Sequence, residues 1–279
     1  MFLDIFVAYD GTPSAEHALA QAVDLARAQN SIGIALQVEG RPTEAHDAFE
    51  QAMVMAKTAG MPDIAGAAAL NLATHIQKAG DFVRARELFS DSMTSFANVR
   101  NSAFQIIALF NMAHGEREQG NWDSALELYS TTLSLAERID HGDLEIGSLA
   151  ARGLCFLELG RIGDAREATA AVKSQLDRRP EWFQGREVAE ALVIRVDVLS
   201  GRPDAAFDRF EQTVRAADLG DAYPAVWLIL TCVPDLARAD SERARMAVER
   251  YRAAADRLGY PELSRRFNLL REATGEGVT

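Results

Sequence analysis

The chain has 279 residues, of which 48% are hydrophobic and 25% are charged. These fractions match ordinary globular proteins and exclude a disordered or low-complexity chain, and a chain of this length buries a core without disulfides or structural metals. With 41 acidic and 29 basic side chains the formal net charge is −12. Because such a protein repels phosphate backbones and anionic lipid, we expect neither nucleic acid nor a membrane as its partner.

The first 29 residues form a segment of their own. An apolar run at residues 2–7 ends at Asp10-Gly11, and a helical pattern then continues from residue 12 through 29. This order predicts a strand, a turn and a helix. Because a lone strand leaves its backbone groups unpaired, one hypothesis is a homodimer that pairs residues 2–9 of two copies. The alternative is that this strand frays or packs as a cap on the structure that follows.

Most of the remaining chain is a repeat of about 40 residues. Glycine recurs at steps of 40, 40, 40 and 41, at Gly40, Gly80, Gly120, Gly160 and Gly201. Alanine follows each glycine by five residues, at Ala45, Ala85, Ala125, Ala165 and Ala206. An aromatic residue stands nine residues after four of the glycines, at Phe49, Phe89, Tyr129 and Phe210, and a small residue stands seven before four of them, at Gly33, Ala73, Ala113 and Gly153. Thr169 and Ile194 are the exceptions.

Each unit predicts two amphipathic helices joined by a tight turn, because glycine adopts the left-handed conformation that ends a helix. The small residues let the paired helices approach closely, and the aromatic residue fills the space toward the next pair. The expected helices are 22–38 and 42–58, 62–78 and 82–97, 102–119 and 122–139, 144–159 and 162–177, and 183–200 and 203–218. A sixth pair, 222–238 and 241–258, has no glycine turn, and a helix after Pro261 would cap the last apolar face.

This pattern of small residue, glycine, alanine and aromatic residue resembles the tetratricopeptide repeat (TPR). The resemblance covers about residues 30–260 and implies an all-α, right-handed superhelical solenoid of about six helix-turn-helix repeats, preceded by the short strand-helix segment of residues 1–29 and followed by a capping helix and disordered tail at 261–279. The family's usual period is about 34 residues. The longer unit looks like the repeats appended to large bacterial signalling ATPases and regulators, although no phosphate-binding GxxxxGK[ST] motif occurs in this chain.

The opening segment resembles the start of a universal stress protein. The string VAYDGTPSAEHALAQAVDLARA carries this resemblance, and it implies that Asp10, which follows the first strand, contacts a nucleotide. That family completes its nucleotide site with a later G-x2-G-x9-G-[ST] loop, which this sequence lacks. The resemblance therefore makes Asp10 a candidate nucleotide-binding residue, and the alternative is a relic or a fusion junction near Asn30.

The sequence offers no catalytic residues, no metal ligands and no cofactor motif. The five histidines form neither HExxH nor a Cys/His pair with metal-ligand spacing. Cys155 and Cys232 are 77 residues apart, which indicates neither a zinc site nor a disulfide framework and fits a reducing, cytoplasmic setting. Cys155 stands between Leu154 and Phe156, so we expect a buried thiol with a raised pKa.

Stacked helix pairs present a concave surface formed by the first helix of each pair. Carrying over the positions of this groove from the TPR family gives a candidate site for a partner protein, comprising Gln37, Leu70, Thr74, Gln77, Phe110, His114, Arg117, Leu154, Leu157 and Arg195. These positions change from polar in the first units to apolar in the middle, where Arg117 accompanies three large apolar residues. The pattern suits a helix or extended peptide with apolar anchors and an acidic flank.

The sequence thus predicts a cytoplasmic, non-enzymatic scaffold or adaptor that binds a peptide or helix of another protein in this groove. One alternative is a small-ligand sensor or regulatory module, similar to the TPR arm of bacterial signalling regulators, because an apolar groove with few polar groups also suits a small molecule. A further alternative is a nucleotide-responsive protein that uses Asp10.

Overall fold

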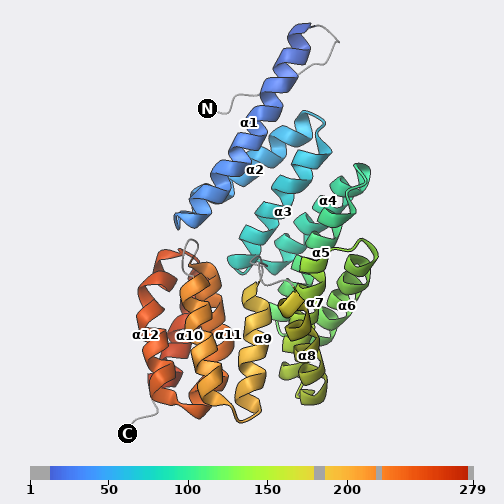
Figure 1. Cartoon of the computed structure of the whole chain (residues 1–279). Coiled ribbons are helices and arrows are strands. Elements are labelled where there is room, and N and C mark those ends of the chain that lie inside the picture. The colour runs from blue at the N-terminus through green and yellow to red at the C-terminus, as the bar shows by residue number, and fades with distance from the viewer. Residues whose placement is uncertain (1–12, 179–185, 218–221, 276–279) are drawn as a thin grey trace. The chain divides into compact units, whose positions relative to one another are not determined.

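A computed structural model describes residues 13–178, 186–217 and 222–275, and these residues form α-helices joined by short turns. Figure 1 shows these helices with their labels. The first five are α1 (Pro13–Val38), α2 (Pro42–Thr58), α3 (Pro62–Lys78), α4 (Phe82–Asn98) and α5 (Ser102–Glu118). The others are α6 (Trp122–Arg138), α7 (Gly142–Glu158), α8 (Ile162–Arg178), α9 (Arg186–Leu199), α10 (Pro203–Ala217), α11 (Tyr223–Ala239), α12 (Ser241–Arg257) and α13 (Pro261–Gly275).

The turns within the helix pairs lie where the repeating glycines predicted them. All five glycines have positive φ angles, from 69° at Gly160 to 95° at Gly80. At Gly80 the backbone N–H donates to the Gln77 carbonyl (3.0 Å), and the N–H of Asp81 donates to the Ile76 carbonyl (3.2 Å). These two bonds satisfy carbonyl groups that the end of a helix leaves open. The predicted helix-turn-helix pairs are therefore confirmed.

The turns between successive pairs have the same left-handed conformation, but in two of them the residue that adopts it is not glycine. Gly60 has a φ of 68°, whereas the equivalent positions 40 and 80 residues later are Arg100 (φ 56°) and Asp140 (φ 53°). A side chain makes this conformation unfavourable by about 1–2 kcal/mol. The backbone is therefore strained in the turns after α4 and α6, but not in the turn after α2.

The repeated small and aromatic residues fill the space between helices. The repeated alanines and the residues nine after each glycine are buried, including Thr169, which replaces the aromatic residue in its unit. At Gly33 in α1, a Cβ atom would lie 2.6 Å from the Phe49 ring of α2, so only glycine permits this contact. The predicted close approach of the two helices is thus confirmed for the first pair.

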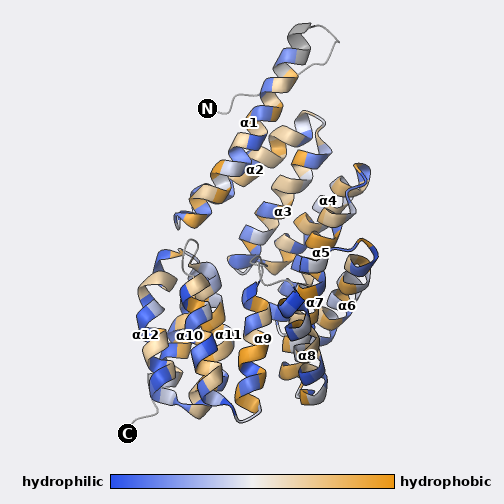
Figure 2. Ribbon diagram, viewed as in Figure 1, coloured by the Kyte–Doolittle hydropathy of each residue, from blue (hydrophilic) through white to orange (hydrophobic). Residues whose placement is uncertain are grey.

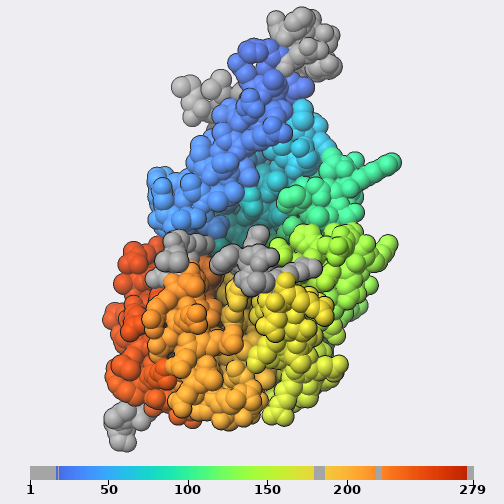
Figure 3. Space-filling view, in the orientation of Figure 1, coloured from blue at the N-terminus to red at the C-terminus, as the bar shows by residue number. Residues whose placement is uncertain are grey.

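The chain divides into two compact units, Met1–Met112 (unit 1) and Ala113–Thr279 (unit 2), and the division falls within α5. In unit 1, α1 packs on α2, α2 on α3 and α3 on α4. In unit 2, the first helices of the pairs form one layer, because α7 contacts α9, α9 contacts α11 and α11 contacts α13. Helices α10 and α12 lie on the face of unit 2 that Figure 3 shows, and along both helices hydrophobic and hydrophilic residues alternate (Figure 2). This alternation is typical of helices that bury one face.

The first helix runs past a boundary that the sequence predicted, whereas the last helices lie where the sequence predicted them. Helix α1 is continuous from Pro13 to Val38, so the expected boundary between residues 29 and 30 lies inside a helix. The strand expected at residues 2–9, the dimer through it and Asp10 all lie outside the described residues. At the other end, α11 and α12 are separated by Asp240 alone, as expected for a pair without a glycine turn, and the helix expected after residue 260 is α13.

None of the helices in the described residues is both long enough and apolar enough to span a bilayer.

Candidate functional site

The residues expected to line the groove fall into both units. In unit 1, Leu70 is buried in the core between helices, and the Thr74 hydroxyl donates to the Leu70 carbonyl (2.9 Å) and accepts from Asn111 (3.4 Å). Gln37, Gln77 and Phe110 are half-buried. The structure thus uses Leu70 and Thr74 for packing and helix contacts within unit 1.

Unit 2 contains a cleft of about 520 Å³, and four of the five candidate residues in this unit line it. They are Arg117, Leu154, Leu157 and Arg195, on α5, α7 and α9. The fifth, His114, lies one turn before Arg117 and is hydrogen-bonded to it (Nε2 to Nη2, 2.8 Å). The repeat register therefore brings these positions of successive first helices to one cavity.

The cleft walls divide into an apolar part and a charged part. The apolar lining comprises Trp122, Leu154, Leu157, Ile162, Leu199, Leu230 and Pro234. The charged lining comprises four arginines, Arg117, Arg195, Arg238 and Arg266, and three acids, Glu118, Glu158 and Asp235. The arginines thus outnumber the carboxylates by one in a chain whose net charge is −12.

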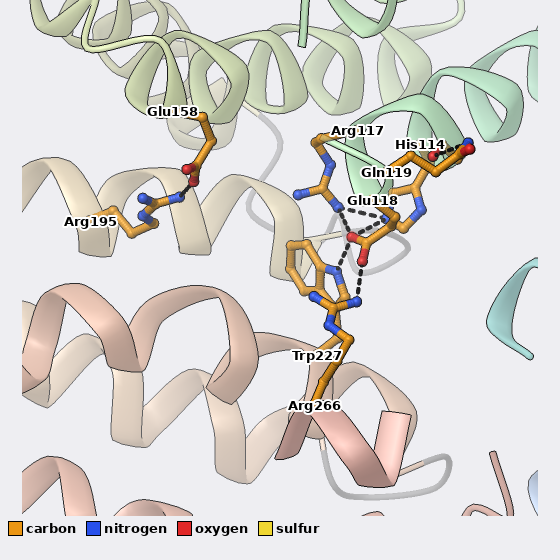
Figure 4. Close-up of polar contacts among 9 residues, drawn as sticks. His114, Arg117, Glu118, Gln119, Glu158, Arg195, Trp227 and Arg266 are labelled. Atoms are coloured by element: carbon orange, nitrogen blue, oxygen red, sulfur yellow. Dashed lines mark hydrogen bonds and ion pairs between the residues drawn. The ribbon is translucent and has the colours of Figure 1, made fainter. Parts of the chain in front are cut away.

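Glu118 is the centre of the first charged group, which joins α5, α11 and α13 (Figure 4). Its carboxylate accepts from Arg117 Nη2 (2.8 Å), from Arg266 Nη1 (2.5 Å) and from the indole nitrogen of Trp227 (3.4 Å). The Arg117 guanidinium also lies over the Trp227 ring, 5.2 Å from its centroid. We call these four residues together with His114 the Glu118 cluster.

The cluster holds Glu118 in its ionised form. Burial alone raises the pKa of this carboxyl, but the charges of Arg117, His114 and Arg266 and the hydrogen bond from Arg266 outweigh burial and lower the pKa from 4.5 to about 2. The side chains of Arg117 and Glu118 are only 8% and 11% exposed. An ion pair this well shielded depends on both partners, because removing one leaves a buried charge uncompensated.

A second charged group lies apart from the first in the close-up view, where Arg195 points toward Glu158 (Figure 4). Arg195 donates from Nε to Asp235 (2.6 Å) and from Nη1 to Glu158 (2.6 Å), and Arg238 donates to the other oxygen of Asp235 (2.5 Å). We call these four residues the Arg195 cluster. Its two arginines and two acids balance in charge.

The repeat spacing predicts the contact between Arg195 and Asp235 but not the contacts of Glu118 with later helices. Arg195 and Asp235 are 40 residues apart, so the repeat period itself places them at equivalent positions on neighbouring first helices. By contrast, the contacts of Glu118 with Trp227 and Arg266 span 109 and 148 residues. No spacing in the sequence indicates a contact over such distances.

The cysteines behave as buried apolar residues. Cys155 and Cys232 are both free thiols in the core, and burial raises the pKa of Cys155 to about 11 and that of Cys232 to about 12. The expectation for Cys155 is confirmed. Within the described residues no three His, Cys, Asp or Glu side chains come together as a group able to hold a metal ion.

Residues 104–168 match the tetratricopeptide repeat family, and the match covers α6, α7 and parts of the neighbouring helices α5 and α8. It does not reach residues 1–29, so the resemblance of that segment to universal stress proteins gains no support. No curated protein sequence matches the chain.

Solved structures with the same fold have little sequence identity to this chain. A Rap protein complexed with Competence and Sporulation Factor is 11% identical with a TM-score of 0.61, over 96% of this chain and 82% of that one. The apo form of the quorum sensor NprR from B. thuringiensis is 14% identical with a TM-score of 0.56, over 93% and 81%.

A third structure is a signal transduction ATPase with numerous domains from Pyrococcus horikoshii, described as having a tetratricopeptide repeat sensor. It is 11% identical with a TM-score of 0.54. The match covers 93% of this chain but only 41% of that larger protein. These likenesses establish a helical repeat fold of the tetratricopeptide type.

Proposed function

We propose that this protein with tetratricopeptide repeats is a non-enzymatic binding module that holds a peptide segment of another protein in the cleft of unit 2. The observation that carries the proposal is the composition of this cleft, where partly exposed apolar side chains of α9 and α11, Leu199, Leu230 and Pro234, lie among paired arginines and acids. Peptide-binding grooves commonly combine apolar pockets, which give affinity, with a few polar groups, which fix orientation.

The fold of the neighbours supports binding rather than catalysis. One of them is a Rap protein complexed with a factor, and another is a quorum sensor. In this chain the charged residues of the cleft are bonded to one another as ion pairs. The cleft groups therefore serve recognition, and we assign no catalytic role to them.

The test is selection of peptides on the full chain, followed by affinity measurements with two variants. Thr231→Trp fills the cleft from α11, whereas Met246→Trp adds the same ring at an exposed position of α12 that does not line the cleft. We expect selected peptides to bind the wild type and Met246→Trp alike and to lose at least about tenfold in affinity with Thr231→Trp, which corresponds to about 1.4 kcal/mol. Peptides that bind all three proteins equally, or a failure to select any peptide, would contradict the proposal.

A small-ligand sensor is the second candidate function. The cleft volume of about 520 Å³ falls within the roughly 300–1,000 Å³ typical of small-molecule sites, and the neighbour from Pyrococcus horikoshii has a tetratricopeptide repeat sensor. Native mass spectrometry of the protein isolated gently from its host separates the two functions. A bound small molecule supports the sensor, and a stoichiometric polypeptide supports the peptide-binding module.

A further inference from the structure

The Glu118 cluster has more positive than negative charge at the edge of the cleft. Two guanidinium groups, those of Arg117 and Arg266, share the single carboxylate of Glu118. The Arg195 cluster, by contrast, pairs two arginines with two acids. Electrostatic attraction for an incoming carboxylate is therefore concentrated at the Glu118 cluster.

Arg266 is the member of the cluster that a ligand can reach. Its side chain is 40% exposed, whereas Arg117 is 8% exposed and packs over Trp227. Among the described residues, Arg266 is bonded only to Glu118, through Nη1. A guanidinium has five N–H donors in a planar fork, so a second carboxylate can bind the remaining donors while the bond to Glu118 persists.

The apolar part of the cleft wall favours a ligand that has apolar groups next to its acidic group. Leu199, Leu230 and Pro234 line the same cleft as Arg266, are at least partly exposed and offer a surface without charge. Leu154 and Leu157 are only 1% and 8% exposed and contribute little to this surface. A ligand that placed only a charged group here would leave this surface in water. Apolar side chains next to an acidic one would instead cover it and contribute about 25 cal/mol for each Å² removed from water.

We propose that the peptide bound in the unit 2 cleft carries an acidic side chain, Asp or Glu, that binds Arg266 while neighbouring apolar side chains cover Leu199, Leu230 and Pro234. This inference rests on the proposed function and specifies the chemistry of the partner. A side chain rather than a terminal carboxylate is the source, because the exposed guanidinium is accessible to a chain that continues beyond it. Arg266 then acts as the specificity-determining residue of the site.

The test begins with a phage-displayed library of random dodecapeptides whose C-termini are fused to the coat protein, so that side chains supply the only carboxylates. Selection is made on the full chain, and peptides are kept when Thr231→Trp abolishes their binding. The kept peptides are synthesised with amidated C-termini and measured by fluorescence anisotropy. We expect them to share one Asp or Glu among apolar residues, and to lose about tenfold or more in affinity when this residue is replaced by Asn or Gln.

The matching variant of the protein is Arg266→Gln, and its control is Arg265→Gln. Arg265 is the adjacent arginine of α13, pairs with Glu262 on the same helix and does not line the cleft. We expect about a tenfold loss with Arg266→Gln, less than a twofold change with Arg265→Gln, and no further loss when the peptide lacking its acid is tested on Arg266→Gln. Circular dichroism confirms that both variants fold, and the peptide substitutions test the same contact without altering the protein.

The outcomes separate this inference from the proposed function. Cleft-dependent peptides that have no acidic residue, or that bind Arg266→Gln as tightly as the wild type, would overturn the inference and leave peptide binding intact. Cleft-dependent binding found only in a library with free C-termini would also overturn it, because the carboxylate would then be terminal. A lack of any cleft-dependent peptide would overturn both.

Discussion

At the scale of single residues, two glycines within helices show opposite effects of a missing Cβ atom. Gly33 in α1 faces the Phe49 ring, which a Cβ atom would approach to 2.6 Å, whereas Gly163 in α8 has no heavy atom within 4 Å of that position. We expect Gly33→Ala to destabilise the protein by about 1–3 kcal/mol through overpacking. Gly163→Ala should stabilise it by about 0.5–1 kcal/mol, because alanine is the better helix former.

Chemical denaturation of the two variants measures this difference directly. Both substitutions add one methyl group to a helix, so they match in composition and differ in what the methyl group meets. If the two midpoints shifted in the same direction, close packing between α1 and α2 would not be the reason for glycine at position 33.

Glu118 gives a prediction about pH. Its pKa in the folded protein is about 2, below the ordinary 4.5, so the unfolded chain binds this proton more readily than the folded one. The stabilisation by the Glu118 cluster is therefore complete above about pH 4.5 and is lost as the pH falls toward 2. We expect Glu118→Gln to lower the free energy of unfolding by about 3 kcal/mol at pH 7 and to flatten its dependence on pH between about 4.5 and 2.

Urea denaturation across this pH range provides the measurement, and Glu44→Gln is the control. Glu44 forms an ion pair with Arg41 on the surface, where both side chains are largely exposed to solvent. Exposed pairs contribute little to stability, so Glu44→Gln should leave both the stability at pH 7 and its pH dependence close to those of the wild type. An equal effect of the two substitutions would contradict a special role for the Glu118 cluster.

At the scale of helices and turns, the left-handed positions between repeats give a further prediction. Arg100 has a φ of 56°, which costs an arginine about 1–2 kcal/mol. Arg100→Gly removes this strain but adds entropy to the unfolded chain, so we expect a net stabilisation of up to about 1 kcal/mol.

The control adds a side chain at the left-handed position of an equivalent turn, the one after α2. Gly60 has a φ of 68° and no heavy atom within 4 Å of its absent Cβ, so strain alone opposes a side chain there. Gly60→Ala should destabilise the protein by about 1 kcal/mol. Thermal melting of both variants tests the pair, and a stabilising Gly60→Ala would contradict the assignment of strain to these turns.

The sequence predicted the helices well because each turn has a local signature. In each pair the glycine marks the end of the first helix, and the alanine five residues later lies in the second helix. The bounds of both helices can therefore be predicted from one short stretch of sequence. The same register placed Arg117, Leu154, Leu157 and Arg195 on successive first helices, and these residues line the cleft. The Glu118 cluster escaped prediction because Trp227 and Arg266 reach it from later helices that no local pattern connects to α5.

The predicted boundary near residue 30 lies inside a continuous helix. The resemblance to universal stress proteins stops there and the repeats begin, which is the basis for the predicted boundary. Helix α1 nevertheless runs through this position without interruption, and its residues Ala22 and Ala26 are buried. A change of motif along a sequence thus does not require a break in the backbone.

At the scale of the whole molecule, the chain divides into two compact units, and repeat proteins unfold locally because each repeat contacts only its neighbours. We expect Phe89→Leu in α4 to raise amide hydrogen exchange mainly in residues 42–98 of unit 1. Phe210→Leu in α10 should act mainly in residues 186–275 of unit 2. Hydrogen-exchange mass spectrometry compares the two fully buried positions, and a uniform increase along the chain in both variants would show a single cooperative unit instead.

The contact between Glu118 and Arg266 has a consequence for how unit 2 can change during evolution. Proteins built from stacked repeats commonly gain or lose whole repeats, because each new pair of helices needs only a neighbour to pack on. In unit 2, however, a 2.5 Å bond joins α5 to α13, across all the helix pairs between them. Inserting or deleting one pair would displace Arg266 from Glu118 and leave the buried carboxylate with one fewer partner, so the number of repeats between these two helices is fixed.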